Sequence, residues 1–233
     1  MDIALFSADG LQFLFRWIHF LAGVAWIGIL YYFNFVQGEY MKEADAQAKA
    51  SVVTKLLPRA LWWFRFGALF TFISGVAMLE SKARMGGWGI FATSWGIFIL
   101  TGAGLGTLMF LNVWLVIWPN QKIVMASAEQ VAKGGQPLPQ AAISAVKAGL
   151  ASRHNTLFSI PMLFFMGAAS HLPLIVNMDF SALNLFLVLA FVIGLLQLNA
   201  IKGKLGPIAS IKGVIHFGIL LTVVLYGLIE FLT

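Results

Sequence analysis

Histidine is the residue type in this sequence that could most readily do chemistry. The four histidines, His19, His154, His171 and His216, lie inside or at the mouth of long apolar segments, and the charged connections between the segments contain none. An imidazole in hydrocarbon is costly unless it is hydrogen-bonded or bound to a metal, so histidines within a membrane are candidates for a functional site. The chain has no cysteine, which excludes thiolate-ligated metals, iron–sulfur clusters and covalently attached haem. Four such histidines therefore predict bound iron, held as haem b.

The elements that position these histidines must be membrane helices. The chain has 233 residues, of which 60% are hydrophobic and 10% charged, and this is more apolar surface than one soluble domain buries. The formal net charge is +6, but the basic residues concentrate in the connections, where orientation signals and anionic lipid head groups explain them. Binding to nucleic acid is therefore rejected, and the lipid bilayer is the expected partner.

The expected fold is all-α, a polytopic bundle of about six transmembrane helices that forms a single domain over residues 1–233. A bilayer core of roughly 30 Å requires about 20 apolar residues per helix. The stretches that meet this length are residues 11–36, 60–79, 93–118, 155–176, 182–201 and 210–232. We expect the first stretch to be a retained helix, since acidic rather than basic residues precede it and no small-residue cleavage site follows it.

The distribution of lysine and arginine predicts the orientation of the bundle. Eleven of them lie in or beside the first, third and fifth connections: Lys42, Lys49, Lys55, Arg59, Lys122, Lys133, Lys147, Arg153, Lys202, Lys204 and Lys212. The second and fourth connections hold two, Lys82 and Arg84. The positive-inside rule then places the first group in the cytoplasm and both termini outside. The first connection is expected to be a cytoplasmic helix, and residues 134–139 of the third a surface turn.

The depths of the histidines predict two sites. With a rise of about 1.5 Å per residue, His19 lies roughly 12 Å and His171 roughly 7 Å inside the outer ends of their spans. His154 marks the cytoplasmic mouth of the fourth span, and His216 lies about 9 Å inside the sixth. His154 and His171 are about 25 Å apart along one helix, too far for one metal centre. We expect one or two haems, with His19 and His171 as ligands of an outer haem and His154 with His216 as ligands of an inner one or lining a second site.

Two arginines are further candidates. Arg65 follows the aromatic run Leu61-Trp62-Trp63-Phe64, and Arg153 is adjacent to His154. Each side chain either extends to the membrane interface or binds a haem propionate or an anionic substrate, because a guanidinium matches a carboxylate in bidentate geometry. Polar residues elsewhere in the apolar segments, namely Asn112, Gln197 and Asn199, are expected to bond neighbouring helices and are assigned no other role.

Four stretches of the sequence resemble one family. They are His19-Phe-Leu-Ala-Gly-Val-Ala-Trp-Ile-Gly28 running on to Tyr31-Tyr-Phe-Asn34, then Leu61-Trp-Trp-Phe-Arg65, then Asn112-Val-Trp-Leu-Val-Ile-Trp-Pro-Asn-Gln-Lys122, and Ser152-Arg-His-Asn-Thr156. In this order they resemble the membrane domain of bacterial urate hydroxylases, the urate oxidase N-terminal family. The first stretch is also similar to membrane-type protoporphyrinogen oxidases and copper-resistance D proteins.

The resemblance implies a multi-pass redox protein of the bacterial inner (cytoplasmic) membrane. Members of the family typically carry a cytochrome c domain after the membrane helices, and they are associated with urate oxidation. The present chain ends at Thr233 without cysteine, so we expect that domain to be missing. The resemblance then implies an external electron acceptor: a separate cytochrome c, a quinone or a redox partner subunit.

Three functions remain open at this point. The first is a haem b protein that transfers electrons, alone, as an oligomer or in a larger complex. The second is an oxidoreductase that acts on urate or a similar heterocycle and binds the anion through Arg65, Arg153 or Asn155. The third is a non-redox channel, transporter or accessory subunit whose histidines only bond neighbouring helices; the absence of an inverted repeat weighs against a transporter.

Overall fold

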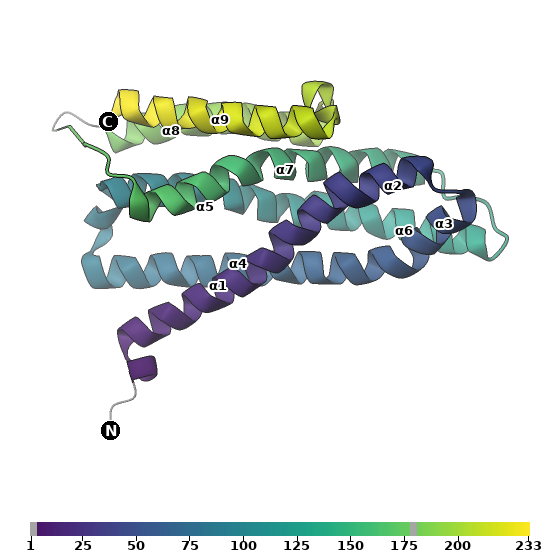
Figure 1. Ribbon diagram of the computed structural model, residues 1–233, viewed down its shortest axis with the longest axis horizontal. Coiled ribbons are helices and arrows are strands. Elements are labelled where there is room, and N and C mark those ends of the chain that lie inside the picture. The colour runs from purple at the N-terminus through teal and green to yellow at the C-terminus, as the bar shows by residue number, and fades with distance from the viewer. Residues whose placement is uncertain (1–3, 178–180) are drawn as a thin grey trace.

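A computed structural model describes residues 4–177 and 181–233, and in this part of the chain it contains helices and no strands. Long helical rods lie side by side along one axis (Figure 1). In chain order the elements are η1 (Ala4–Phe6), α1 (Ala8–Tyr31), η2 (Tyr32–Gln37), α2 (Gly38–Glu43), α3 (Ala46–Ser51), η3 (Val52–Leu56), α4 (Leu57–Gly86), η4 (Trp88–Ala92), α5 (Ser94–Leu111), η5 (Asn112–Ile117), α6 (Trp118–Ala132), α7 (Ala141–His171), α8 (Ala182–Lys202), η6 (Gly206–Ala209) and α9 (Ile211–Leu232). The expected all-α membrane bundle is confirmed.

The first three rods are longer than a membrane span. Helices run without a break over Ala8–Glu43, Ala46–Gly86 and Ser94–Ala132, which are 36, 41 and 39 residues. At about 1.5 Å per residue each rod exceeds a bilayer core of about 30 Å. The parts of these three rods that exceed the bilayer core, together with the start of α7, extend past the ends of α8 and α9 (Figure 1). The helix expected in the first connection therefore continues the membrane helices on both sides of it, and the turn expected in the third connection follows α6, with Gly134 at φ +85°.

Three single-turn π segments interrupt these rods. They are η2, η3 and η5, and two of them carry a buried asparagine, Asn34 in η2 and Asn112 in η5. A π turn inserts one residue into the helical ladder and is frequent at functional sites, because it redirects side chains. The bundle thus departs from regular helix where it places polar groups inside.

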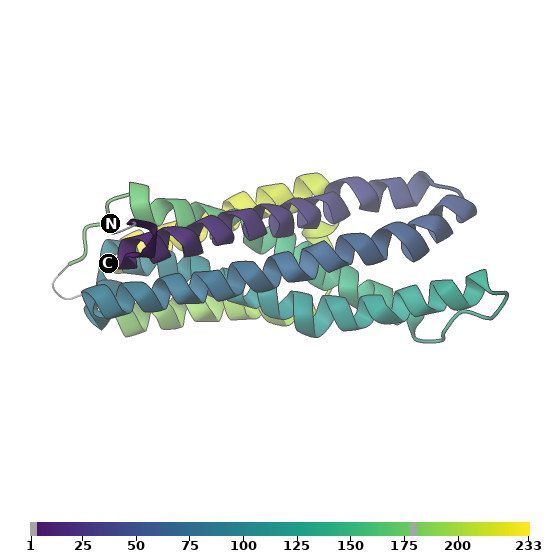
Figure 2. The same ribbon diagram turned by 90° about the horizontal axis from the view of Figure 1, so that it is seen from below.

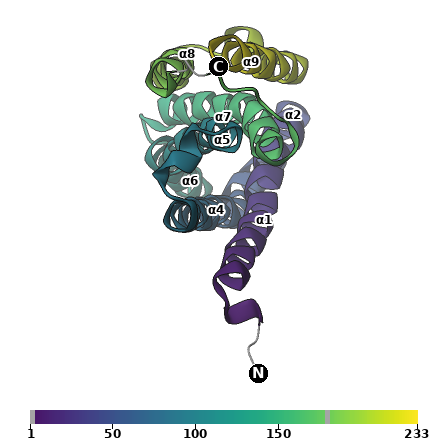
Figure 3. The ribbon, with the colours of Figure 1, turned by 90° about the vertical axis from the view of Figure 1, so that its left-hand side faces the viewer.

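Helix α7, which carries the fourth predicted span, is the central element. It contacts α1, α5, α6, α8 and α9, and Figure 3 shows it between the α8–α9 pair and the remaining helices. Within the described residues, five rods are long and apolar enough to cross a membrane by composition, and α7 is not among them. Since 15 of its 31 residues are buried, α7 is shielded from lipid by its neighbours and tolerates polar side chains that a peripheral helix does not.

The outer boundary of the fourth predicted span is wrong. The prediction places it at residue 176, whereas α7 ends at His171. Leu172 has φ −109° and ψ 119°, because the following Pro173 excludes its neighbour from helical geometry. His171 is consequently the last helical residue and not one that lies roughly 7 Å inside the helix.

The arrangement of α1 determines where His19 lies. Figures 1 and 3 show α1 packed along α4 and diverging from α7 toward its N-terminal end. Figure 2 shows that the two chain ends lie at the same end of the bundle, as the even number of predicted spans requires. His19, on the diverging half of α1, therefore contacts α4.

Candidate functional site

A buried amide cluster joins three helices in the half of the bundle away from the chain ends, which we call the inner half after the predicted orientation. Asn155 of α7 is 0% exposed and Asn112 of η5 is 1% exposed. Asn155 donates from Nδ2 to the carbonyl of Met109 at 2.9 Å, and its Oδ1 accepts from Asn112 Nδ2 at 2.9 Å. Asn112 and Gln197 of α8 exchange a reciprocal amide pair at 2.6 and 3.0 Å. The expectation that Asn112 and Gln197 bond neighbouring helices is confirmed, and Asn155 is engaged through both amide atoms.

The same face of α7, one turn to either side of Asn155, bonds α1 and η2. Asn34 donates from Nδ2 to Ser152 Oγ at 2.9 Å. The hydroxyl oxygens of Tyr31 and Ser159 are 2.9 Å apart. Ser159 directs its hydroxyl hydrogen to the carbonyl of Thr156, so Tyr31 is the donor of this pair. These bonds and the amide cluster fix α7 against both neighbours, since polar pairs between helices are a main source of specific packing in membranes.

His154 is completely buried and bonded through both ring nitrogens. It is 1% exposed. Its Nδ1 lies 2.9 Å from the carbonyl of Leu150, and a carbonyl only accepts, so Nδ1 carries the hydrogen. Its Nε2 lies 2.9 Å from Asn199 Nδ2 and accepts from that amide. His154 is therefore neutral, and the lone pair that would bind a metal is occupied by a hydrogen bond from α8.

The backbone of the loop that follows α8 fixes the orientation of the Asn199 amide. Lys204 donates its backbone N–H to Asn199 Oδ1 at 3.2 Å, and its carbonyl accepts from Asn199 Nδ2 at 3.1 Å. A Cβ at Gly203 would lie 1.7 Å from Asn199 Oδ1, so a side chain there would displace the Asn199 amide. The expectation that Asn199 bonds a neighbouring helix is confirmed, with His154 as its partner.

His19 has the same tautomer but a different environment. Its Nδ1 lies 3.3 Å from Ser74 Oγ on α4. The Ser74 hydroxyl directs its hydrogen to the carbonyl of Phe70 at 2.6 Å, so toward His19 the oxygen accepts and Nδ1 carries the hydrogen. The Nε2 lone pair then has no protein partner in the part of the chain that the structure describes. Gly75 provides room for the ring, since a Cβ there would lie 3.1 Å from His19 Cε1.

The other two histidines are exposed on the bundle. His171 ends α7, and His216 lies on an exposed face of α9. Over residues 4–177 and 181–233, no group of three or more His, Asp or Glu side chains is placed to hold a metal ion. The structure therefore does not gather the four histidines into one site. Haem does not need such a group, because its iron takes one or two axial protein ligands.

Arg65 lies on an aromatic surface. Its guanidinium carbon is 3.8 Å from the ring centroid of Trp118 and 5.1 Å from that of Phe66. This cation–π contact between α4 and α6 stabilises the charge inside the bundle. The Nε atom of Arg65 is buried and has no partner among the described residues.

Arg153 belongs to the same set of incompletely bonded groups. Of the seven buried side-chain nitrogen and oxygen atoms without a partner in the described residues, five come from the inner half of the bundle: Gln37 Oε1, Arg65 Nε, Trp114 Nε1, Gln121 Oε1 and Arg153 Nη1. The bonds from Asn34 to Ser152 and from Asn112 to Asn155 set η2, η5 and α7 at a common level. An unmatched buried polar atom costs about 1–3 kcal/mol, so these five atoms, which we call the inner polar set, require waters or a bound ligand.

The residues of the outer end fit haem ligation better than those of the inner end. A metal-ligating histidine ordinarily donates its second ring N–H to a protein acceptor, which fixes the ring and the tautomer. His19 does so to Ser74 and keeps Nε2 open, beside a glycine that leaves space. His154 also has its N–H fixed, but ligation through Nε2 requires Asn199 to move away.

Several of these residues receive no individual role from the sequence. Tyr31, Asn34, Ser152 and Ser159 lie in apolar stretches or in the resemblance fragments, and nothing in their spacing shows which helix each one faces. The sequence did contain one indication of this contact: Asn34, Asn112 and Asn155 each lie in one of the family-resemblance stretches, and these stretches meet around α7. Of the inner polar set, only Arg65 and Arg153 were singled out from the sequence.

Comparison with known proteins gives a family. The family described as Urate oxidase N-terminal matches residues 82–225, more than half of the chain. The matched range includes His154, His171 and His216, and it begins after His19 and Arg65. No curated protein and no solved structure gives a significant match.

Proposed function

The chain belongs to the urate oxidase N-terminal family, and from that premise we propose that it is a membrane-embedded protein that binds haem b and transfers electrons to a separate partner. The partner is a cytochrome c, a quinone or a redox subunit, and the membrane is the bacterial inner membrane. When bound, haem b supplies a one-electron couple between ferric and ferrous iron. The function therefore requires from the chain a fixed imidazole in a partly desolvated place.

The observation that carries this proposal is the state of His19. Its Nδ1–H is held by Ser74, so the ring cannot turn without losing a bond, and Nε2 has no hydrogen-bond partner among the described residues. The side chain is half-buried, which keeps competing water low. We propose that His19 would hold the haem iron. His171 ends α7, from which this half of α1 diverges, so it could bind the same iron only if the two helices approached each other.

At the inner end we propose a smaller role for histidine. His154 holds Asn199 and thereby the loop after α8, so its contribution as an inner ligand depends on release of that amide. His216 is exposed toward lipid or a partner subunit. A second haem between them stays a prediction that is secondary to the outer site.

The haem proposal is tested on the full chain purified from membranes. We expect a Soret band, reducible alpha bands, and between one and two haems per polypeptide in a pyridine haemochrome assay. A protein that elutes as a folded, monodisperse species but is colourless and free of iron would contradict the proposal. That result would favour the non-redox reading, in which the histidines only bond helices as His154 does.

A second candidate function is favoured by the inner polar set. One nitrogen each of Arg65 and Arg153, an indole N–H and two amide oxygens are buried without partners among the described residues, and these donors and acceptors are of the types that bind a planar anion with both acceptors and donors. We propose that Arg65 and Arg153 bind urate or a similar heterocycle there, while its electrons leave to an external cytochrome.

The second candidate is tested by urate consumption. Membranes that contain the chain, supplied with oxidised cytochrome c, should consume urate and reduce the cytochrome, and the Arg153→Gln variant should lose most of this rate. Equal rates in membranes with and without the chain would remove urate as the substrate while leaving the haem proposal intact.

A further inference from the structure

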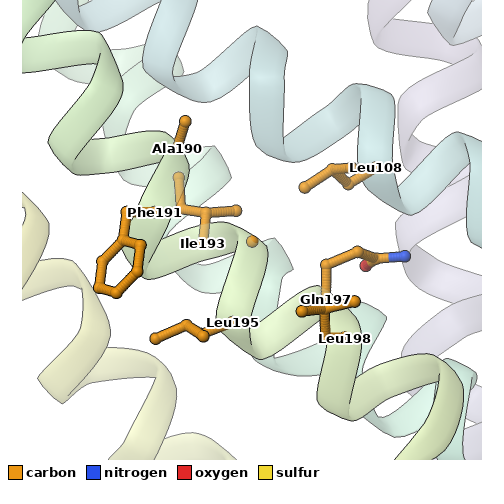
Figure 4. A pocket seen from close by; sticks show the side chains of 8 residues that line it. Leu108, Ala190, Phe191, Ile193, Leu195, Gln197 and Leu198 are labelled. Carbon is orange, nitrogen blue, oxygen red and sulfur yellow. The ribbon is translucent and has the colours of Figure 1, made fainter.

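Two exposed sides of the bundle differ in the polar groups that they present. The hollow along α8 is apolar apart from Gln197, and Figure 4 shows the Gln197 amide nitrogen directed away from Phe191 and Leu195. This amide is paired with Asn112 through both its nitrogen and its oxygen, so the hollow has the composition of a plain lipid contact. The exposed side of α1 near its outer end differs, because it presents a guanidinium group, that of Arg16.

Arg16 lies inside the membrane, between the outer end of the bundle and His19. Four residues before it, Gln12 donates from Nε2 to the carbonyl of Met78 at 3.4 Å, and two residues after Met78 the charged end of α4 begins at Glu80. Arg16 is therefore about 6 Å, or one helical turn, deeper in the membrane than Gln12, and His19 is about 4.5 Å deeper again. An arginine at this depth is costly unless a partner or the membrane interface receives its charge.

Arg16 and His19 occupy neighbouring positions on one side of α1, because they are three residues apart in a helix. The Nε2 atom of His19 has no partner among the described residues, and the two ion pairs that these residues form do not include Arg16. Helical side chains lean toward the N-terminus, which for α1 is the outer end. From the inside to the outside, α1 thus presents an imidazole nitrogen without a partner and then a cation without one.

The side of α1 that carries Arg16 is the side that contacts α7 further in. Tyr31, which bonds Ser159 of α7, follows Arg16 by 15 residues, or about four turns. On α7, Leu163 and Gly167 follow Ser159 by four and eight residues on the same face, and both are exposed. The two helices diverge in this outer half (Figures 1 and 3), so the faces that are in contact at Tyr31 are both exposed at the level of Arg16.

We propose that Arg16 binds a propionate of the haem whose iron His19 holds, an inference that rests on the proposed function. The propionates are carboxylates at one edge of the macrocycle, and a guanidinium matches a carboxylate in bidentate geometry. The order of the two groups along α1 places that edge toward the outer end. A lipid phosphate would also meet the guanidinium, but it would leave His19 Nε2 unmatched. Arg65 and Arg153, the arginines that the sequence favours for this role, lie in the inner half.

The experiment compares two ligands that differ only in their carboxylates. The full chain, produced in haem-deficient cells and held in phosphatidylcholine nanodiscs, is titrated with haemin and with haemin dimethyl ester, which keeps the iron and the ring. Arg16→Gln should weaken haemin binding about tenfold or more, since a hydrogen bond to a charged group contributes about that much, and should leave binding of the ester unchanged. Equal weakening for both ligands, or for neither, would overturn the proposal.

Two further variants separate the bond from general effects of charge. Arg16→Lys keeps the charge but loses the bidentate geometry, so its haemin affinity should fall between those of the unaltered chain and Arg16→Gln. Arg84→Gln is the matched control, because Arg84 lies at the same end of the bundle, on α4, and pairs there with the exposed Glu80. It should bind haemin as the unaltered chain does. If Arg84→Gln weakens haemin binding as much as Arg16→Gln does, the assignment of Arg16 is wrong.

The midpoint potential provides a second readout. In the haem-loaded chain, Arg16→Gln should lower the potential, because a propionate without its cation stabilises ferric iron, and an unchanged potential would count against the bond. An unaltered chain that binds neither ligand contradicts the proposed function and this inference with it. A chain that binds haemin equally well with and without Arg16 contradicts the inference alone.

Discussion

The environments of His19 and His154 show how one residue type acquires two roles. Both imidazoles carry their hydrogen on Nδ1, and both give it to an oxygen acceptor. They differ in what meets Nε2: Asn199 donates to that atom in His154, while in His19 it has no partner among the described residues. The first arrangement uses the ring to join α7 to α8, and the second leaves Nε2 without a protein partner, which the proposed haem ligation requires. Both histidines thus have the same tautomer, and the neighbouring helix decides whether the Nε2 lone pair is free of a protein hydrogen bond.

The largest effect is expected from removing the open imidazole. His19→Ala should lower haem per polypeptide by about tenfold or more, because the proposed iron ligand is lost. The measurement is the pyridine haemochrome assay on purified protein. His154→Ala, which removes an imidazole with an occupied lone pair, should retain most of the haem. A reversed result, with haem lost only in the His154 variant, would place the iron at the inner end.

A smaller effect is expected from disturbing the surroundings of His19. Gly75→Ala places a Cβ 3.1 Å from His19 Cε1, and Ser74→Ala removes the acceptor of Nδ1–H. Each should weaken haem affinity by about 10–100-fold, the usual effect of losing support for a metal-ligating histidine. Haem titration and the midpoint potential provide the measurements.

A glycine with open space provides the control for this pair. Gly104 on α5 has nothing within 4 Å of an added Cβ, so Gly104→Ala should leave haem affinity and potential unchanged. If Gly104→Ala has as large an effect as Gly75→Ala, the position beside His19 has no special role.

At the inner region the expected effect is on stability. His154→Ala removes the two buried hydrogen bonds of the ring, to the Leu150 carbonyl and from the Asn199 amide, and leaves a cavity between α7 and α8, which costs about 1–3 kcal/mol of the free energy of unfolding. Thermal unfolding in detergent micelles, followed by circular dichroism, measures it. His216→Ala, at an exposed position of α9, is the control and should unfold as the unaltered chain does. A His154 variant of full stability would show that the bond to Asn199 contributes little.

The smallest effect is expected from the loop that supports Asn199. Gly203→Ala would bring Cβ to 1.7 Å from Asn199 Oδ1, so the amide must move and its bond to His154 weakens, at a cost of about 1 kcal/mol. Gly149→Ala on α7, where a Cβ meets nothing within 4 Å, is the matched control. Combined with His154→Ala, the loop variant should add less than its single effect, because both remove one interaction. Full additivity would separate the loop from the histidine.

The spans could be predicted from the sequence because the bilayer imposes a length and a composition. The fifth span was expected at 182–201, and α8 covers Ala182–Lys202. The fourth failed at its outer end, where five apolar residues follow the helix but Pro173 prevents its continuation. The first three predicted spans were also shorter than the helical rods that contain them, because charged residues past the membrane continue a helix as readily as apolar ones do.

The candidate site could be predicted less completely. Asn112, Gln197 and Asn199 were expected to bond between helices, and they do. Their partners could not be assigned, because residues 85 and 45 positions apart in the chain meet here through the packing of different helices. Pairing of the histidines as haem ligands stays a prediction.

The sequence by itself determined the environment of this protein, the number of long helices, the family and the residue types able to bind iron or an anion. These follow from hydropathy and from local spacing, which act along the chain. Tertiary structure alone decided which imidazole keeps an open lone pair, because Ser74 and Asn199 come from other helices, and the side-chain hydrogen bond of a residue depends on what lies across from it. The same packing left Arg65 Nε and Arg153 Nη1 buried without partners among the described residues, which nothing in the sequence indicates.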